Sequence, residues 1–210
     1  MIAIRLTVPF ACFRKAHARE LVESELLPPP ATCYGALLSL VGETDRERHL
    51  GARVTAGLWN APVLNRVLRT FWQIKTRNAP QGTGNNMGPD YQELVTQAEI
   101  AVFCDSAMEA HPGQGLEGRV RAAFSDPGQI ERFGGWSLGE STHLINDAHL
   151  LEVEALKAPC RIFLEGGARS LTLPVWVDHV GAAGTRYAVG ELKDILGMPP
   201  VERLPSVARA

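Results

Sequence analysis

The chain has 210 residues, of which 45% are hydrophobic, so it can bury the core of one medium-sized domain. Its apolar runs are short and interrupted, and we expect no transmembrane helix and no contact with a membrane. A net charge of −2 argues mildly against a free-standing nucleic-acid-binding protein, because such proteins are usually basic.

The N-terminus and the cysteines indicate the compartment. Residues 1–15 begin apolar and become basic afterwards, which is the reverse of a signal peptide, so we expect a cytoplasmic protein. Disulfides are rare in the cytosol, and the cysteines form neither a CxxC motif nor a cluster of metal ligands. We therefore expect buried thiols, no metal site and no cofactor. The four cysteines are Cys12, Cys33, Cys104 and Cys160.

The first third of the chain predicts a strand followed by a helix. Residues 1–8 alternate between apolar and polar side chains, which is typical of a half-buried strand. Residues 10–30 form a long polar and basic connection that ends in three prolines, and proline is well placed to begin a helix. Residues 31–41 have apolar side chains at i, i+3, i+4 and i+7, which predicts a helix packed on a sheet.

The middle of the chain predicts a long β-hairpin. Residues 54–60 and 64–76 have the composition of strands. Residues 77–94 are rich in glycine and proline and almost free of apolar side chains, which predicts a flexible excursion outside the core. Residues 98–104 then read as the returning strand, so the segment 64–104 is a hairpin with a mobile tip.

The last third predicts a helix and several short strands. Residues 115–125 have the pattern of a second amphipathic helix. Residues 144–156 are ambiguous between strand and helix, and residues 160–189 read as short strands, with Pro174 indicating an edge strand or a bulge. The tail from Pro199 is expected to be loosely ordered. The order of elements predicts an α+β protein with a ferredoxin-like βαββαβ domain and a long hairpin inserted between its middle strands.

A glycine loop, residues 132–142 (RFGGWSLGEST), follows the second predicted helix. It matches neither the Walker motif nor the dinucleotide fingerprint. Two interpretations stay open: a tight connection with glycines at positive φ, or a loop whose backbone N–H groups approach a phosphate chain. In the second case Arg132 would pair with phosphate and Trp136 would stack on a base. The glycines concerned are Gly134, Gly135 and Gly139.

Two groups of basic residues are candidates for contact with RNA. The first lies on one face of a predicted strand of the hairpin and contains an aromatic ring, which suits single-stranded RNA but is equally compatible with a solvated outer face. It consists of Arg69, Lys75 and Arg77, with Phe71 and Gln73 on the same face. The second follows the first strand, beside the start of the first helix, where it would bind an anion or form a solvated basic loop. It consists of Arg14, Lys15, His17 and Arg19.

A metal-free RNA-cleaving set is conceivable but is not required by any spacing. A histidine would act as general base and a lysine would stabilise the developing charge. The residues concerned are Lys15, His17, Tyr34 and His143. Tyr34 is expected to face the core and His143 to hydrogen-bond near the glycine loop, and no Ser-His-Asp or HExxH pattern is present. We therefore expect no catalytic residue.

Four motifs in this order resemble the Cas-five family of CRISPR-associated proteins, which belongs to the RAMP group. They are TVPFACFRK, LPPPATCYGALLSLVGE, GPDYQELV and RFGGWSLGEST. The resemblance is closest to the type I-B or myxobacterial-type branch and fades after about residue 146. It implies a ferredoxin-like RAMP domain over residues 1–146, with a thumb hairpin at about 73–98, and a small β-rich extension over residues 147–210.

The resemblance also implies a role in the Cascade surveillance complex. Family members cap the foot of the complex and hook the 5′ handle of the crRNA, which Arg14, Lys15 and the loop from Gly134 to Gly139 would line here. The thumb tip, residues 78–96, would contact the adjacent backbone subunit, with the large subunit beside it and target DNA reached through the complex. One branch, in type I-C, cleaves precursor RNA with a Tyr, Lys and His set.

That cleaving set cannot be placed on matching positions of this chain, so we expect a non-catalytic subunit of a CRISPR effector complex. A subunit that shares its RNA with neighbours can be nearly neutral overall, which accounts for the net charge of −2. The two rival hypotheses are a metal-independent endoribonuclease that processes precursor crRNA and a ferredoxin-like interaction module without an RNA role.

Overall fold

One antiparallel sheet organises the chain. The structure is a computed structural model that describes residues 1–15, 21–72, 75, 77–78, 80, 83–152, 156–180 and 182–209. Its strands are β1 (Ile2–Ala11), β4 (Arg53–Leu58), β5 (Val63–Trp72), β6 (Met87–Asp105), β7 (Asp147–Leu151), β8 (Cys160–Glu165), β9 (Leu171–Trp176) and β10 (Arg186–Ile195). They lie in the order β7-β1-β6-β4-β8-β10-β9, and β5 pairs with the outer half of β6. The fold is therefore mixed α/β with a mostly antiparallel sheet and few helices.

Strand β1 confirms the strand predicted over residues 1–8. Its alternate side chains Ile2, Ile4, Leu6 and Val8 are buried in the core, whereas Arg5 between them is exposed. The strand pairs with β6 on one side and with β7 on the other, both antiparallel. It therefore lies inside the sheet rather than at an edge.

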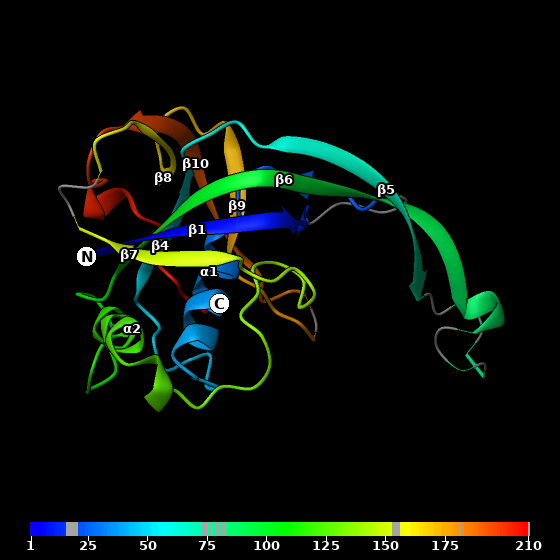
Figure 1. Ribbon diagram of the computed structural model, residues 1–210, viewed down its shortest axis with the longest axis horizontal. Helices are drawn as coiled ribbons and strands as arrows, with labels where there is room; N and C mark the ends of the chain where they lie inside the picture. Colours follow the sequence, from blue (N-terminus) through cyan, green and yellow to red (C-terminus); the bar gives the residue numbers. More distant parts are fainter. Residues whose placement is uncertain are drawn as a thin grey trace.

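Both predicted helices are present, and they lie on one side of the sheet, below β1 and β7 in Figure 1. Helix α1 (Pro30–Leu40) begins on proline, whose missing N–H is not needed at the first helical position. Helix α2 (Leu116–Ser125) buries one stripe against the same core, as its spacing predicts. The buried side chains of α1 include Cys33, Tyr34, Leu37 and Leu38, and those of α2 are Leu116, Val120 and Ala123.

The hairpin predicted over residues 64–104 is confirmed, but its second strand is much longer than predicted. Strand β6 begins at Met87 instead of residue 98, and it pairs with β5 from Met87 to Thr96 before it enters the central sheet. The far ends of β5 and β6 project away from the rest of the chain (Figure 1). The prediction of an irregular segment over residues 77–94 was therefore wrong in its second half. This part of the hairpin projects from the core, so its two faces do not have to alternate between apolar and polar side chains. The composition therefore did not indicate a strand before residue 98.

The segment between β1 and α1 contains two very short strands, β2 (Phe13–Arg14) and β3 (Ser24–Glu25), which pair with each other. It also contacts the base of the hairpin, because the N–H of Val22 donates to the carbonyl of Tyr91 and the N–H of Glu93 donates to the carbonyl of Val22, both at 2.9 Å. The connection thus binds the hairpin to the central sheet.

The C-terminal strands continue the same sheet beyond β4. Strand β8 pairs with β4 through Gly57 and Leu58, and β10 and β9 follow outward. Strand β9 is at the edge and contains Pro174, and the β9–β10 register shifts between Arg186 and Tyr187. Both the strands and the edge position predicted for Pro174 are confirmed.

The tail after Pro199 is packed against the sheet, so the prediction of a loosely ordered tail was wrong. A short 3-10 helix, η4 (Val201–Arg203), leads into Leu204 and Val207, which are both buried. The N–H of Val207 donates to the carbonyl of Ala52 at 2.8 Å, which pairs the tail with the start of β4. The terminal position suggested disorder, but these contacts to distant residues hold the tail.

All four cysteines are buried free thiols, as predicted. Burial raises the pKa of the Cys160 thiol to about 12, so this group stays protonated at neutral pH. Among the described residues, no group of three or more His, Cys, Asp or Glu side chains is placed to hold a metal ion. No helix in the described part of the chain is long and apolar enough to cross a membrane.

Candidate functional site

The glycine loop folds back on itself and is anchored in the core. Ser137 and Leu144 form an isolated antiparallel bridge, and Leu138 between them is fully buried. Gly134 and Gly139 have φ values of +78° and +94°, so the predicted tight connection with glycines at positive φ is confirmed for these two positions. The loop is thus a fixed structural element beside β1 and α1.

Gly139 brings the backbone of the loop against the end of β1. A Cβ atom at this position would lie 2.8 Å from the carbonyl oxygen of Cys12. The N–H of Cys12 also donates a hydrogen bond to Nδ1 of His143, at 3.1 Å. The loop is therefore attached to the β1–β2 junction by one close backbone approach and one hydrogen bond.

The base of the hairpin meets the loop at Glu140. Arg69 of β5 donates to the Glu140 carboxylate at 3.1 Å, and the side-chain amide of Gln92 of β6 donates to its other oxygen. The Gln92 carbonyl oxygen accepts from the same Arg69. Nε2 of His143 lies 3.7 Å from Glu140. Three segments that are far apart in the sequence therefore converge on one carboxylate.

The environment of His143 favours the neutral imidazole. Burial lowers its pKa, and the nearby Arg69 acts in the same direction, against the opposing effect of Glu140. Because Nδ1 accepts from the Cys12 N–H, the proton of the neutral ring is on Nε2, the nitrogen that faces Glu140. The neutral imidazole therefore faces the carboxylate with its N–H, at a distance longer than a hydrogen bond.

The His143→Asn variant is expected to lose less stability on acidification than the wild type. Because the folded-state pKa of His143 lies below its ordinary value, the unfolded chain binds a proton first as the pH falls below about 6.5. This stabilisation is present above the unfolded pKa and is lost as the pH falls toward the folded pKa. Asparagine keeps an acceptor for the Cys12 N–H but does not titrate. Denaturation at about pH 7.5 and about pH 5.5 measures the difference, and equal losses in both proteins would contradict it.

The predicted basic residues after β1 lie close in sequence to this junction. Arg14 is exposed on β2, directly after Cys12 and Phe13. The Lys15 ammonium is 3.9 Å from the carboxylate of Glu23. His17 and Arg19 fall outside the described residues. Of this group, Arg14 and Lys15 therefore directly follow the Cys12–Phe13 segment that contacts the glycine loop.

The residues of the predicted basic strip on the hairpin lie in two separate places. Arg69 lies at its base, bound to Glu140 and with its guanidinium 5.5 Å from the centre of the Phe71 ring. Lys75 and Arg77 lie beyond the described end of β5 and are exposed. Gln73 is outside the described residues. Arg69 thus belongs with the glycine loop, and the other two cations belong with the far end of the hairpin.

The residues predicted at the start of the glycine loop have different environments. Arg132 is exposed and forms no ion pair within the described ranges. Gly135 packs against the Leu144 side chain and does not have a positive φ. The Trp136 indole N–H donates to the carbonyl of Ala36 at 2.9 Å, and the ring packs edge-on against Phe124. Trp136 therefore joins the two helices, and this packing gives no support to the expected base stacking.

The structure reveals three site residues that sequence reasoning missed. They are Phe10, Gln92 and Glu140. Phe10 is exposed and packs edge-on against the His143 ring at 5.3 Å between centres. Glu140 and Gln92 both occur within the quoted motifs, but the hydrogen bonds that join them to Arg69 and to each other span more than twenty residues along the chain. No local signal distinguishes such a pair from ordinary surface polar residues.

The residues of the conceivable RNA-cleaving set have separate partners. Tyr34 is buried, as predicted, and its hydroxyl donates to the carbonyl of Arg46 at 2.8 Å. Burial raises the pKa of Tyr34 well above its ordinary value. His143 is bound to Cys12 and Lys15 lies near Glu23. No contact in the described part of the chain joins any two of these three side chains.

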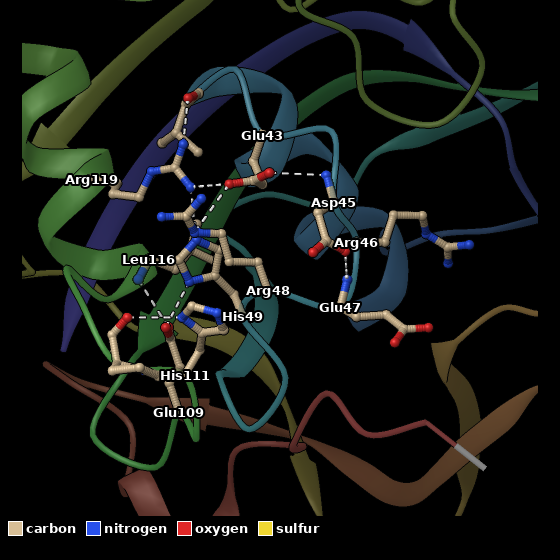
Figure 2. A network of polar contacts seen from close by, with 12 residues as sticks. Glu43, Asp45, Arg46, Glu47, Arg48, His49, Glu109, His111, Leu116 and Arg119 are labelled. Atoms are coloured by element: carbon tan, nitrogen blue, oxygen red, sulfur yellow. Dashed lines mark hydrogen bonds and ion pairs between the residues drawn. The ribbon is translucent and has the colours of Figure 1, made fainter.

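A second polar cluster joins the segment after α1 to α2 and to the loop before α2 (Figure 2). Nδ1 of His49 is 2.7 Å from Glu109, and its Nε2 accepts from Arg119 at 3.0 Å. Arg119 also donates to Glu43. Burial acts to raise the pKa of Glu43, but hydrogen bonds from Arg119 and the Asp45 N–H outweigh it and lower the pKa. The His49 and Glu109 side chains are only 2% and 5% exposed, so this cluster serves the fold rather than a substrate.

Comparison with known proteins identifies a relative of high sequence identity, although no family model matches the chain. The CRISPR-associated protein Cas5 of Myxococcus xanthus (strain DK1622) is 60% identical over 210 residues, which are 100% of this chain and 98% of that protein.

Solved structures share the fold. A chain described as a CRISPR RNA-guided surveillance complex has a TM-score of 0.59 at 12% identity, covering 98% of this chain and 93% of its own. A second, described as the crystal structure of a Cas protein, has a TM-score of 0.52 at 16% identity, covering 98% and 97%. These two similarities concern the fold alone. At 60% identity over its full length to the Myxococcus protein, the chain belongs to the Cas5 family of CRISPR-associated proteins, the family that its motifs resemble.

Proposed function

We propose that this protein is a non-catalytic, RNA-binding subunit of a type I CRISPR Cascade complex and that it caps the 5′ handle of the crRNA. The observation that carries the proposal is the 60% identity to a Cas5 protein over the whole chain. The fold similarity to a chain of a CRISPR RNA-guided surveillance complex supports the same role.

The sheet order supports a ferredoxin-like domain in the first part of the chain. Strands β7, β1, β6 and β4 are neighbours in that order, α1 connects β1 to β4, and α2 connects β6 to β7. This is the arrangement expected for a βαββαβ unit. We assign residues 1–146 and strand β7 to this unit, the projecting hairpin to the thumb, and the strands from β8 onward to the extension.

The proposed RNA surface combines the glycine loop with the β1–β2 junction. Arg14 and Arg132 are exposed cations on these two segments, and Arg69 is at the base of the thumb. Guanidinium groups bind phosphate with two parallel hydrogen bonds, which suits the backbone of a structured RNA handle. In this proposal the thumb contacts the backbone subunit, the large subunit lies beside the cap, and target DNA is reached through the assembled complex.

The test is co-purification with mapping of RNA ends. The tagged protein is expressed with its genomic neighbours and a CRISPR array, and the 5′ ends of the bound RNA are sequenced. A uniform 5′ end a few nucleotides upstream of each spacer is expected. Scattered ends, or a complex that forms without RNA, would contradict the handle cap. Defined cuts in labelled repeat RNA by the pure protein in the presence of chelator would contradict the non-catalytic assignment.

Single variants test the proposed surface. Arg14→Ala and Arg132→Ala are each expected to reduce handle retention severalfold, because each removes a cation that contacts phosphate. Arg161→Ala is the matched control, since Arg161 is an exposed arginine on β8 that pairs with Asp194. The measurement is crRNA content per complex after a salt wash. Normal crRNA content in both test variants would show that neither Arg14 nor Arg132 belongs to the interface with RNA.

A further inference from the structure

We infer that Arg69, Gln92 and His143 form a binding site for one phosphodiester group of RNA, and that the Glu140 carboxylate occupies this site in the free chain until RNA displaces it. The inference rests on the proposed RNA-binding function and goes beyond it. It assigns an anion site to residues of the thumb base and explains why an acidic side chain lies inside a proposed RNA surface.

The orientation of each donor is determined by a second hydrogen bond. The Gln92 carbonyl oxygen accepts from Arg69, so its amide nitrogen must face Glu140. Nδ1 of His143 accepts from the backbone, so its Nε2–H faces the same carboxylate. Arg69 adds a positive charge 3.1 Å from the carboxylate. The three donors are therefore aimed at one anion before any ligand arrives.

The two neutral donors of the site are buried, whereas the Glu140 carboxylate that occupies the site is partly exposed. Gln92 and His143 are 0% and 2% exposed, so the two neutral donors are built into the fold. The Glu140 and Arg69 side chains are 37% and 39% exposed, so they border solvent. Glu140 can therefore rotate outward without unpacking the core, while Gln92 and His143 stay in place.

A phosphodiester can replace the carboxylate chemically. Both groups present two anionic oxygens to a guanidinium, and arginine binds either through the same planar fork. The exposed Phe10 ring next to His143 offers an apolar surface to the adjoining nucleotide. RNA can bind Arg69 only after the ion pair between Arg69 and Glu140 has been broken. The free energy needed to break this pair lowers the affinity for RNA.

The experiment measures binding of the full chain to a fluorescent single-stranded RNA of the repeat sequence at fixed salt. Glu140→Gln is expected to bind roughly fivefold more tightly than the wild type, as expected for removing a competing partly exposed ion pair. Glu131→Gln is the matched control, because it changes the same charge on the loop just before Arg132, and Glu131 forms no ion pair within the described ranges. It is expected to change affinity by less than about twofold.

A double variant identifies the mechanism. In the Arg69→Ala background, Glu140→Gln is expected to give no gain, because there is no guanidinium to release. Glu140→Asp retains the charge but shortens the side chain, and it is expected to bind RNA more tightly than the wild type but less tightly than Glu140→Gln. This variant keeps the test informative if Glu140→Gln unfolds, which thermal melting detects.

The outcomes are distinguishable. Equal gains from Glu131→Gln and Glu140→Gln, or a gain that persists without Arg69, would overturn the phosphate site and leave RNA binding intact. Unchanged affinity in both Glu140 variants would do the same. Absence of binding by the wild type and every variant would instead overturn the proposed function and this inference with it.

Discussion

Replacement of Glu109 by alanine is expected to lower the free energy of unfolding by about 3–5 kcal/mol, the range for breaking a buried ion-paired network. Glu109 accepts from the N–H of Leu116 at the start of α2 and lies 2.7 Å from His49 (Figure 2). Without the carboxylate, the first turn of α2 loses an acceptor for its N–H groups and the buried His49 loses its partner. Arg119 then remains in a site with less negative charge.

Chemical denaturation followed by circular dichroism measures this effect. Glu47→Ala is the control, because Glu47 forms an exposed ion pair with Arg209 at 2.7 Å and is expected to contribute at most about 1 kcal/mol. Glu109→Gln, which retains an acceptor oxygen, is expected to lie between the two. A loss below about 1 kcal/mol for Glu109→Ala would show that the network is not needed for stability.

The Gly139→Ala variant is expected to lose about 2–4 kcal/mol of stability and to release the glycine loop from β1. A residue with a side chain is strained at φ +94°, and the added Cβ would lie 2.8 Å from the carbonyl oxygen of Cys12. The backbone must move to relieve this contact. Since Glu140 and His143 follow directly in the chain, their placement beside Arg69 is expected to be lost as well.

Gly134→Ala separates the two causes of this effect. Gly134 has φ +78°, but no atom lies within 4 Å of an added Cβ, so only the backbone strain of about 1 kcal/mol remains. Thermal unfolding of both variants and crRNA retention in the complex are the measurements. If the two variants behave alike, close approach to Cys12 is not what determines the position of the loop.

Local patterns in the sequence determined most of the elements near the core. The alternation in residues 1–8, the helical spacing in residues 31–41 and 115–125, and the strand composition of residues 160–189 all correspond to observed elements. In β1 and α2 the buried side chains lie mainly on one face, which imposes a period that can be read along a few residues. Strand β8 buries side chains on both faces, so its composition rather than a period indicates it. The family resemblance rests on the same kind of local information.

Only the tertiary structure decided the rest. The start of β6 at Met87, the packing of the tail on β4, and the meeting of Arg69, Gln92 and Glu140 all depend on partners far away in the sequence. A strand outside the core has no obligatory apolar period, and a polar side chain carries no local sign of which distant group will bind it. The sequence therefore determined where the chain buries its apolar faces, whereas the folded sheet decided which polar groups come together, because those contacts form between segments that only the sheet brings side by side.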